Sequence, residues 1–455
     1  MESQPRPIIR ALIRRLPLIA LLCVGIALFA LVSEASRSDA TRHGMPAHTA
    51  GPRPPRHVRL PSFAMAAQHG VDQLIGLGGR TPASQDPHNG LWGGHTMPNW
   101  WQSALALLST VRYLERTHST DPVYQRAIML LYNKNVVRPN THAPLDFANW
   151  FNDDTGWWGV AWLEAAKYEL NVRHDRVNAD KFLTVAEWDA SFIDQQEKRC
   201  GGIEWGMGKP PDATTTAEYM ALTAGLYGLR NDPGRFQDKS KAGRWLVDSQ
   251  WALAYLIRTG LVNLKSGMVM DSIYGKSCKP YGRPLTYTEG EVAEALVQMG
   301  MALHQPAYYK QAAVFLRYAV NRKSGLVRRD GTLREHCEDV QYNCNRLQSR
   351  LDIPAYKGLL VNAIDDWSTV TRSKEFHPFL LTQAKSILRN AIVDGGSRPC
   401  STAANCLFGP YWGPPPNLIN WAIRRTVGGQ ESGIDAMTAV LPPAGVAAHR
   451  HIHRF

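Results

Sequence analysis

The sequence lacks several patterns that mark common classes of protein. It contains no Cys-x-x-Cys pair, and His304 and His336 stand alone, which disfavours a structural zinc site. It contains no Asn-x-Ser/Thr acceptor, which disfavours a heavily glycosylated product. It shows no fixed internal period, which argues against a helical-repeat scaffold. Long runs of alternating β-branched residues are also missing, so we expect few strands.

Basic charge is concentrated at the two ends of the chain. The formal net charge is +12, but residues 1–59 hold nine Arg against Glu2, Glu34 and Asp39, and residues 441–455 add two more Arg. The body between them is only weakly basic and shows no basic stripe with interleaved aromatic residues. We therefore expect no nucleic-acid partner.

An apolar run without charged residues spans residues 16–32. Four Arg precede it, and Ser33-Glu34-Ala35-Ser36 follows it as a small-residue cleavage site would. The run is longer than most signal-peptide cores and slightly short for a membrane-spanning helix. Residues 1–35 are therefore predicted to be a signal peptide or a membrane anchor. Both alternatives place the body outside the membrane, either secreted or tethered to its outer face.

Cysteine usage agrees with export. Cys23 lies inside the apolar run, and six cysteines remain in the body. An even number of thiols in an exported domain predicts disulfides. The short spacings favour Cys337–Cys344 and Cys400–Cys406 as local pairs, which leaves Cys200–Cys278. We expect no metal ion and no organic cofactor.

Two further segments are predicted not to pack. Residues 36–61 are rich in Pro, Arg, His and Ser, which is typical of a disordered tether. Residues 431–455 carry Pro442-Pro443 and three His near the end, and we interpret them as a flexible tail, although a His-rich end can also bind metal. Residues 62–430 are expected to form a single catalytic domain.

The body has the period of α-helices. Apolar residues recur every three to four positions in stretches that are separated by Gly, Pro and Asn-Asp breaks. These stretches are residues 100–116, 157–171, 183–196, 215–229, 239–259, 289–303, 308–321, 353–371, 376–393 and 418–425, with a weaker one at 123–137. Helices rich in Ala and Trp alternate with more charged ones. This predicts an all-α fold, an (α/α)6 barrel with apolar inner helices and amphipathic outer helices.

Asp153 and Asp154 are adjacent in the segment Phe151-Asn152-Asp153-Asp154-Thr155-Gly156-Trp157-Trp158. Adjacent carboxylates repel, which can raise one pKa while the other stays low, as glycoside hydrolysis requires of its acid and its nucleophile. The Trp pair supplies flat apolar faces for stacking sugar rings. The segment also has the composition of a helix start, because acids favour the first turn. Both interpretations can hold together.

Five segments match one known family in order. They are Trp100-Trp101-Gln102, Asn152-Asp153-Asp154-Thr155-Gly156-Trp157-Trp158, Cys200-Gly201-Gly202-Ile203-Glu204-Trp205, Thr286-Tyr287-Thr288-Glu289-Gly290 and Tyr356-Lys357-Gly358-Leu359-Leu360. In these segments the chain resembles glycoside hydrolase family 76, the endo-α-1,6-mannanases and their fungal cell-wall transglycosidase relatives. The resemblance extends over residues 70–425. It implies an (α/α)6 fold, α-1,6-mannan substrates and a retaining mechanism.

The same resemblance assigns roles to residues. Asp153 would be the nucleophile and Asp154 the acid/base. Adjacent residues suit the carboxyl separation of about 5–5.5 Å that retention needs, rather than the separation of about 6.5–9.5 Å of inversion. The candidates for substrate contact are Asn152, Trp101, Trp157, Trp158, Trp205, Tyr287, Glu289 and Lys357. Asn152 is expected to hold a carboxylate by a hydrogen bond.

Departures from the family pattern leave alternatives open. Thr288 and Glu289 stand where the family has Asn and Gln, and the loop 208–214 also differs, so distal subsites are expected to differ. Glu289 would either raise the pKa of the acid or serve as a helix-terminal acid. We expect a monomer that hydrolyses a mannan-type polysaccharide or oligosaccharide. The alternatives are a cell-wall transglycosylase, a non-catalytic glycan-binding protein, and another (α/α)6 enzyme such as a polyuronide hydrolase.

Overall fold

The computed structural model describes residues 60–93, 99–136, 147–196, 198–274, 277–338, 347–393, 399–414 and 426–443. The chain divides into two units, Met1–Gly51 and Pro52–Phe455, and every described residue belongs to the second unit. The apolar run at residues 16–32 lies outside the described ranges. Within those ranges, no helix has the length and hydrophobicity needed to cross a membrane.

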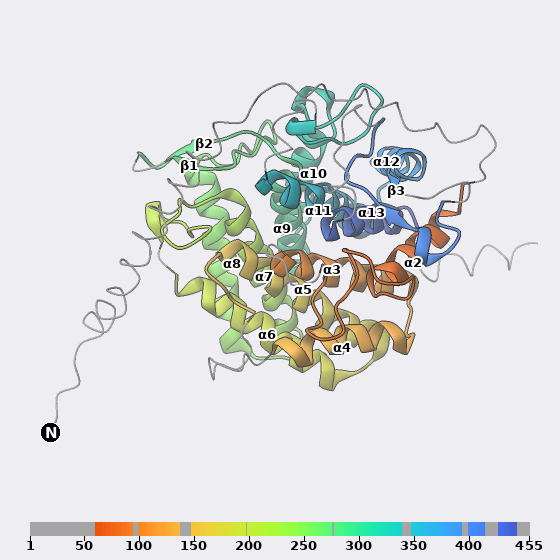
Figure 1. The fold of residues 1–455 in the computed structure, drawn as a ribbon. Coiled ribbons are helices and arrows are strands. Elements are labelled where there is room, and N and C mark those ends of the chain that lie inside the picture. Colours follow the sequence, from red (N-terminus) through yellow and green to blue (C-terminus); the bar gives the residue numbers. More distant parts are fainter. Residues whose placement is uncertain are drawn as a thin grey trace, which may run out of the picture. The chain divides into compact units, whose positions relative to one another are not determined.

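Helices provide almost all of the regular structure (Figure 1). The α-helices are α2 (Phe63–Leu74), α3 (Asn99–Thr117), α4 (Pro122–Asn135), α5 (Asn152–Tyr168), α6 (Arg176–Asp194), α7 (Ala213–Asn231), α8 (Lys239–Thr259), α9 (Thr286–Leu303), α10 (Pro306–Ala319), α11 (Leu347–Thr371), α12 (His377–Asn390) and α13 (Val427–Thr438). A single π-helical turn, Glu169–Arg173, follows α5. Strand β1 (Ser272–Tyr274) pairs antiparallel with β2 (Lys279–Tyr281), and β3 (Ile392–Val393) pairs antiparallel with β4 (Leu407–Phe408).

Alternate helices form a closed ring. Helix α3 packs on α5, α5 on α7, α7 on α9, α9 on α11 and α11 on α13, and α13 packs back on α3. The intervening helices lie outside this ring, with α6 on α5, α8 on α7, α10 on α9, and both α2 and α12 on α13. The predicted all-α (α/α)6 barrel is therefore confirmed.

The burial of each helix follows from its composition. Helix α7 is uncharged over most of its length and is buried on nearly all sides, as an inner helix must be. Helix α8 instead buries residues at helical spacing, including Ala242, Trp245, Ser249 and Ala252, and turns its Lys and Arg residues to solvent. Apolar and amphipathic helices alternate because each outer helix covers the gap between inner ones.

The backbones of the inner helices α9 and α11 approach each other closely at Gly290. A Cβ atom on this glycine would lie 2.7 Å from the backbone N and 2.8 Å from the Cα of Leu360. Backbone atoms of a packed helix cannot rotate away, so a side chain at this position would have to push the two helices apart.

We expect Gly290→Ala to lower the free energy of unfolding by about 1–3 kcal/mol, because the added methyl group overpacks a backbone contact. The measurement is urea denaturation followed by Trp fluorescence. Gly228→Ala in α7 is the matched control, since its Cβ would meet Ala302 Cβ at an ordinary 3.7 Å. The control should be neutral or stabilising, because Ala favours helix over Gly. Equal losses in both variants would contradict this account of the contact.

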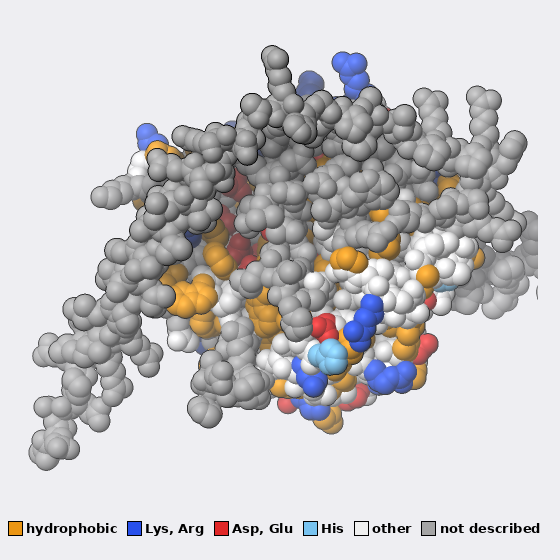
Figure 2. Space-filling view, in the orientation of Figure 1, with side chains coloured by type: hydrophobic (Ala, Val, Ile, Leu, Met, Phe, Trp, Pro, Cys, Tyr) orange, Lys and Arg blue, Asp and Glu red, His pale blue; other side chains and the backbone are white. Residues whose placement is uncertain are grey.

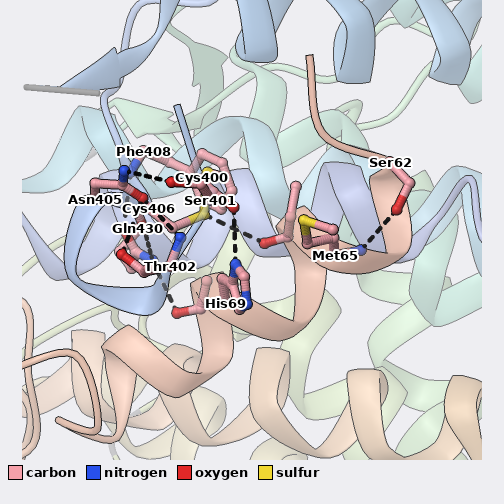
Figure 3. The surroundings of a disulfide bond; sticks show 12 residues. Ser62, Met65, His69, Cys400, Ser401, Thr402, Asn405, Cys406, Phe408 and Gln430 are labelled. Atoms are coloured by element: carbon pink, nitrogen blue, oxygen red, sulfur yellow. Dashed lines mark hydrogen bonds between the residues drawn. A yellow bond between two sulfur atoms is a disulfide. The ribbon is translucent and has the colours of Figure 1, made fainter. Parts of the chain in front are cut away.

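The loop between Cys400 and Cys406 connects the two ends of the domain (Figure 3). Its disulfide is formed, and the Cys400 carbonyl oxygen lies 2.8 Å from Nδ1 of His69 in α2. The Nε2 group of Gln430 in α13 donates to the carbonyl oxygen of Cys406 at 3.1 Å and to that of Gly70 at 2.9 Å. The buried glutamine thereby ties this loop to both α2 and α13.

The structure confirms two of the predicted disulfides. Cys200 pairs with Cys278, and Cys400 pairs with Cys406. The structure does not describe the side chains of the predicted third pair, Cys337–Cys344. The predicted helix at residues 418–425 also lies outside the described residues.

The helical domain ends later than the sequence analysis placed it. Helix α13 is buried along its whole length and closes the ring between α11 and α3, so residues 431–438 belong to the core and not to a tail. Its three glycines and scattered polar residues give it a weak apolar periodicity, which is why the sequence pattern did not indicate an inner helix.

Candidate active site

The adjacent carboxylates lie where the inner helices begin. Helix α5 starts at Asn152, so Asp153 and Asp154 occupy its first turn. Asp212 caps the start of α7, and Tyr287 lies in the first turn of α9. Figure 2 shows Asp and Glu side chains gathered in a recess between hydrophobic ones, below the β1–β2 hairpin in the view. Because helix N-termini carry partial positive charge, this end of the ring favours carboxylates.

Hydrogen bonds fix the geometry of the Asp pair. The backbone N–H of Asp154 donates to Oδ1 of Asp153 at 2.9 Å. The side chain of Asn149 donates from Nδ2 to Oδ2 of Asp154 at 2.5 Å, and its Oδ1 accepts the backbone N–H of Phe151 at 2.7 Å. Asn149 is thus held by the turn that leads into α5, and it orients the second carboxylate of the pair.

Both carboxyl groups have raised pKa values although both residues remain partly exposed. Burial raises the pKa of Asp153 well above its ordinary value, and the charges of Asp154 and Asp212 raise it further. Burial also raises the pKa of Asp154 to about 7, while the hydrogen bond from Asn149 lowers it and the charge of Asp352 raises it. Because the two groups are neighbours, their protons belong to the pair. The pair therefore holds at least one proton near neutral pH.

A third carboxyl group lies beside the pair. Glu218 of α7 is fully buried, and its carboxyl group lies against Gly156 of α5, where any larger residue would collide with it. Neither carboxyl oxygen has a hydrogen-bond partner among the residues that the structure describes. Burial, the charge of Glu291 and the charges of the pair raise its pKa well above the ordinary value. Its surroundings therefore favour the protonated form of Glu218.

Two more acids extend the site toward β1. Burial raises the pKa of Asp212 to about 7, against hydrogen bonds from Thr215 that lower it. Burial raises the pKa of Asp271, and the hydroxyl of Tyr287, which donates to it at 3.2 Å, lowers it. In the described part of the chain, no three His, Cys, Asp or Glu side chains are arranged to hold a metal ion.

Stacked tyrosines border the same site. The rings of Tyr287 in α9 and Tyr356 in α11 have centroids 4.1 Å apart at an interplanar angle of 26°, and both residues are partly exposed. Burial raises the pKa of both hydroxyl groups, and the charge of Asp153 contributes to each shift. The pair therefore presents aromatic surface close to the carboxylates. Sequence reasoning selected Tyr287 but missed Tyr356.

Of the four tryptophans predicted to contact substrate, Trp205 is the one that keeps appreciable exposure. It stacks on Phe151 with ring centroids 5.7 Å apart at 11°, and Nζ of Lys209 lies 5.5 Å from its ring. Trp101 and Trp157 pack against each other with centroids 4.6 Å apart and are almost fully buried. They can therefore offer little surface to a ligand.

The structure does not support the predicted stacking role of Trp158. This side chain has no exposed surface and packs against Trp100, Phe147 and Trp162. Successive residues of a helix point about 100° apart, so α5 cannot direct both Trp157 and Trp158 toward the site. Trp157 takes the inward position, where its indole lies beside Glu291 of α9 and lowers the pKa of that carboxyl group, which burial raises to about 7.

Two other predicted substrate contacts are buried structural residues. Asn152 donates from Nδ2 to the carbonyl oxygen of Glu204 at 2.7 Å, so it holds the Gly201–Trp205 loop, and Asn149 holds the carboxylate instead. Glu289 has no exposed surface and accepts the backbone N–H of Val269 at 2.9 Å.

Lys357 is also buried, away from solvent. Its Nζ donates to the carbonyl oxygen of Pro410 at 2.6 Å and forms an ion pair with Glu338, whose side chain is equally buried. The lysine therefore anchors the segment after β4 to α11.

Several neighbours of the pair were not predicted from the sequence, and they come both from the turn before α5 and from a distant part of the chain. Asn149 stands just before the motif that was selected. Glu218 is the one charged residue between Ala213 and Leu229, and a lone acid in an apolar helix is a signal of a functional position. Asp212 precedes that helix as its N-cap, and an N-cap aspartate gives no sequence signal that its charge also raises the pKa of Asp153.

A separate cavity of about 260 Å³ lies where the inner helices end. Its wall includes Arg112 and Arg116, which form ion pairs with Asp366 and Asp365. Because its cations are paired with acids and Asp153 and Asp154 do not line it, this cavity is part of the polar packing of the ring.

Comparison with known proteins places the chain in a family. The family model described as glycosyl hydrolase family 76 matches residues 83–417. The chain belongs to glycosyl hydrolase family 76. This family-76 chain is accordingly a glycoside hydrolase. A comparison with curated proteins gives no match.

Solved structures share the fold of this family-76 chain. An α-1,6-mannanase of Salegentibacter sp. HEL1_6 superposes with a TM-score of 0.62 at 20% identity, over 83% of this chain and 99% of that one. Dfg5 from Chaetomium thermophilum, in complex with glucosamine, gives a TM-score of 0.63 at 17% identity, over 86% and 94%. An α-mannanase of Bacteroides thetaiotaomicron gives 0.58 at 12% identity, over 84% and 96%. At these identities the likeness shows the fold.

Proposed function

We propose that this chain hydrolyses α-1,6-mannosidic linkages in a mannan-type polysaccharide with retention of configuration. The observation that carries the proposal is the Asp153–Asp154 pair in the first turn of α5, in a chain of family 76. The Salegentibacter enzyme supports it, because an inactive variant with two adjacent aspartates replaced is known in complex with α-1,6-mannotetrose.

The proposed reaction has two displacements. Asp153 attacks the anomeric carbon while Asp154 gives its proton to the leaving glycosidic oxygen, which yields a glycosyl ester on Asp153. Asp154 then takes a proton from water, the water oxygen attacks the anomeric carbon, and the Asp153 carboxylate leaves. Because the two carboxyl groups titrate as a pair, the reactive form is the singly protonated one in which the proton lies on Asp154.

The test measures cleavage of mannans that differ in linkage by the purified enzyme. We expect new reducing ends from linear α-1,6-mannan and none from α-1,2- or α-1,3-linked mannan, because these share the α configuration and differ only in the position of the linkage that the proposal specifies. A polyuronide serves as the control for another (α/α)6 activity. Cleavage of the polyuronide, or no release from any mannan, would contradict the proposal.

The pH profile should reflect the raised pKa values of the pair. The reaction needs one ionised and one protonated carboxyl group, so kcat/KM should rise as the pair loses its first proton and fall when it loses the second, both at higher pH than for ordinary Asp carboxyl groups. Asn149→Ala should move the falling limb to higher pH, because the lost hydrogen bond stabilised the charged form of Asp154, the group that must keep its proton. An unchanged falling limb would show that Asn149 does not tune the pair.

A transglycosylase is the second candidate, since the fold is shared with Dfg5 and since the same two carboxylates would pass the glycosyl group to a sugar hydroxyl instead of water. Incubation with a labelled second mannooligosaccharide separates the two. Hydrolysis gives only shorter products, and transfer gives labelled products longer than the added acceptor.

We also propose that the chain is exported, with residues 1–35 as signal or anchor and residues 36–61 as a tether. The charge-free run at residues 16–32 and the two disulfides of the body support this. Fractionation of cells that produce the full chain tests it. Recovery of the enzyme in the soluble cytoplasmic fraction, with free thiols, would contradict export.

A further inference from the structure

The β1–β2 hairpin exposes two aromatic rings on one face. Ser272 pairs with Tyr281 and Tyr274 pairs with Lys279, so these four side chains share the outer face of the hairpin, while Ile273 on the other face is buried. Tyr274 is 64% exposed and Tyr281 is 60% exposed. Their ring centroids lie 5.5 Å apart at an angle of 50°, so each ring supports the other.

The hairpin follows directly along the chain from a residue of the active site. Asp271, which accepts the hydroxyl of Tyr287 beside the Asp pair, is the residue that precedes β1. Tyr274 comes three residues after Asp271, which corresponds to about 10 Å along an extended strand. Figure 1 shows the hairpin at the edge of the helical ring, next to the acidic recess of Figure 2. A polymer that leaves the carboxylates past Tyr287 would therefore reach the two exposed tyrosines.

The hairpin is held rigidly although it lies at the edge. The Cys200–Cys278 disulfide ties the residue before β2 to the loop that leads toward α7. The backbone N–H of Ile273 donates to the carbonyl oxygen of Pro211 at 2.9 Å, and Ser272 forms a β-bridge with Asp212. A ligand that stacks on the two rings would not have to order this segment, so little binding energy would be lost.

We propose that Tyr274 and Tyr281 form a distal subsite, here called the tyrosine platform, that binds the polysaccharide chain several sugar units away from the cleaved bond. This inference rests on the proposed function. Each tyrosine offers an apolar face to a sugar ring and a hydroxyl group to its polar edge, and the exposed Lys279 and Arg283 offer further donors to sugar hydroxyls. The platform makes the enzyme prefer long chains and cut them internally, because short substrates occupy the carboxylate site without reaching it.

The test compares a long and a short substrate in the full-length enzyme. The Tyr274→Ala/Tyr281→Ala variant should show about a tenfold rise in KM for linear α-1,6-mannan, because it loses two stacking faces. Its kcat and its kinetics with α-1,6-mannotriose should equal those of the wild type. The Tyr274→Phe/Tyr281→Phe variant is the matched control, which keeps the rings and should retain most of the affinity for mannan.

Each outcome decides the question. Equal KM values for mannan in the wild type and the Ala variant would overturn the platform, and so would a parallel loss with mannotriose. If the wild type cleaves neither substrate, the proposed function fails, and the platform is then judged by retardation of the proteins in gels that contain the mannan. Retardation that the Ala variant loses supports the platform, and equal migration overturns it. A change of oligomeric state in the Ala variant would identify the face as a contact between copies instead.

Discussion

Replacement of Asp153 by Asn is expected to lower kcat on an α-1,6-mannoside by about 10⁴-fold or more, because no glycosyl ester can form. Replacement of Asp154 by Asn should cost about 10²–10⁴-fold, the usual contribution of a general acid/base. Substrate binding should change little in either variant, since the amide has nearly the shape of the carboxylate. Initial rates on linear α-1,6-mannan measure both effects.

The two roles can be separated by an external nucleophile. With an activated mannoside that needs no acid, azide should attack the glycosyl ester in Asp154→Ala and give a product with the anomeric configuration of the substrate. In Asp153→Ala, azide should enter the space of the missing carboxylate and give the opposite configuration. If the two variants gave the opposite assignment of product configurations, Asp154 would be the nucleophile.

Asp180→Asn is the control for these substitutions, because Asp180 is exposed on the outer helix α6. It should keep full activity. Thermal unfolding of all variants must match the wild type for the comparison to be valid. Full activity in Asp153→Asn would remove this residue from the mechanism.

Loss of the Cys200–Cys278 disulfide is expected to lower the free energy of unfolding by about 4 kcal/mol. The two cysteines lie 78 residues apart in sequence, and a crosslink over a long loop removes much conformational entropy from the unfolded chain. The Cys200→Ser/Cys278→Ser variant should therefore unfold at a lower urea concentration, followed by Trp fluorescence.

Cys400→Ser/Cys406→Ser is the matched control. These cysteines are 6 residues apart, so the same argument gives a loss of about 2 kcal/mol. We predict that the Cys200→Ser/Cys278→Ser variant loses more free energy of unfolding than the Cys400→Ser/Cys406→Ser variant. Equal stability of the wild type and the Cys200→Ser/Cys278→Ser variant would show that the hairpin and the Gly201–Trp205 loop are fixed by packing alone.

The fold could be predicted because the inner and outer helices have different compositions. Helices such as α7 and α8 differ in how polar residues repeat, and that difference is visible along the sequence. The sequence pattern did not predict that α13 is an inner helix. Its glycines and polar residues are buried by contacts with α3 and α11, and no local sequence pattern indicates these contacts.

The candidate site could be predicted only in part. The motif located the Asp pair, but a motif does not state which face of a helix each residue takes, so Trp158 was selected although its ring belongs to the core. The charge of Lys357 suggests a contact with substrate, but in the structure this charge is paired with the buried carboxylate of Glu338. Glu218 and Tyr356 reach the pair from helices far along the chain, and their approach follows from closure of the ring.

The measurement that most directly tests the account is proton NMR of the full-length enzyme with a linear α-1,6-mannooligosaccharide, followed from the first minutes. The account predicts that the α-anomer of the product forms first and that the β-anomer appears later by mutarotation, because two inversions at one carbon give retention. Early β-anomer would exclude Asp153 as a covalent nucleophile, and absence of turnover would contradict the proposed hydrolysis of α-1,6-mannosides.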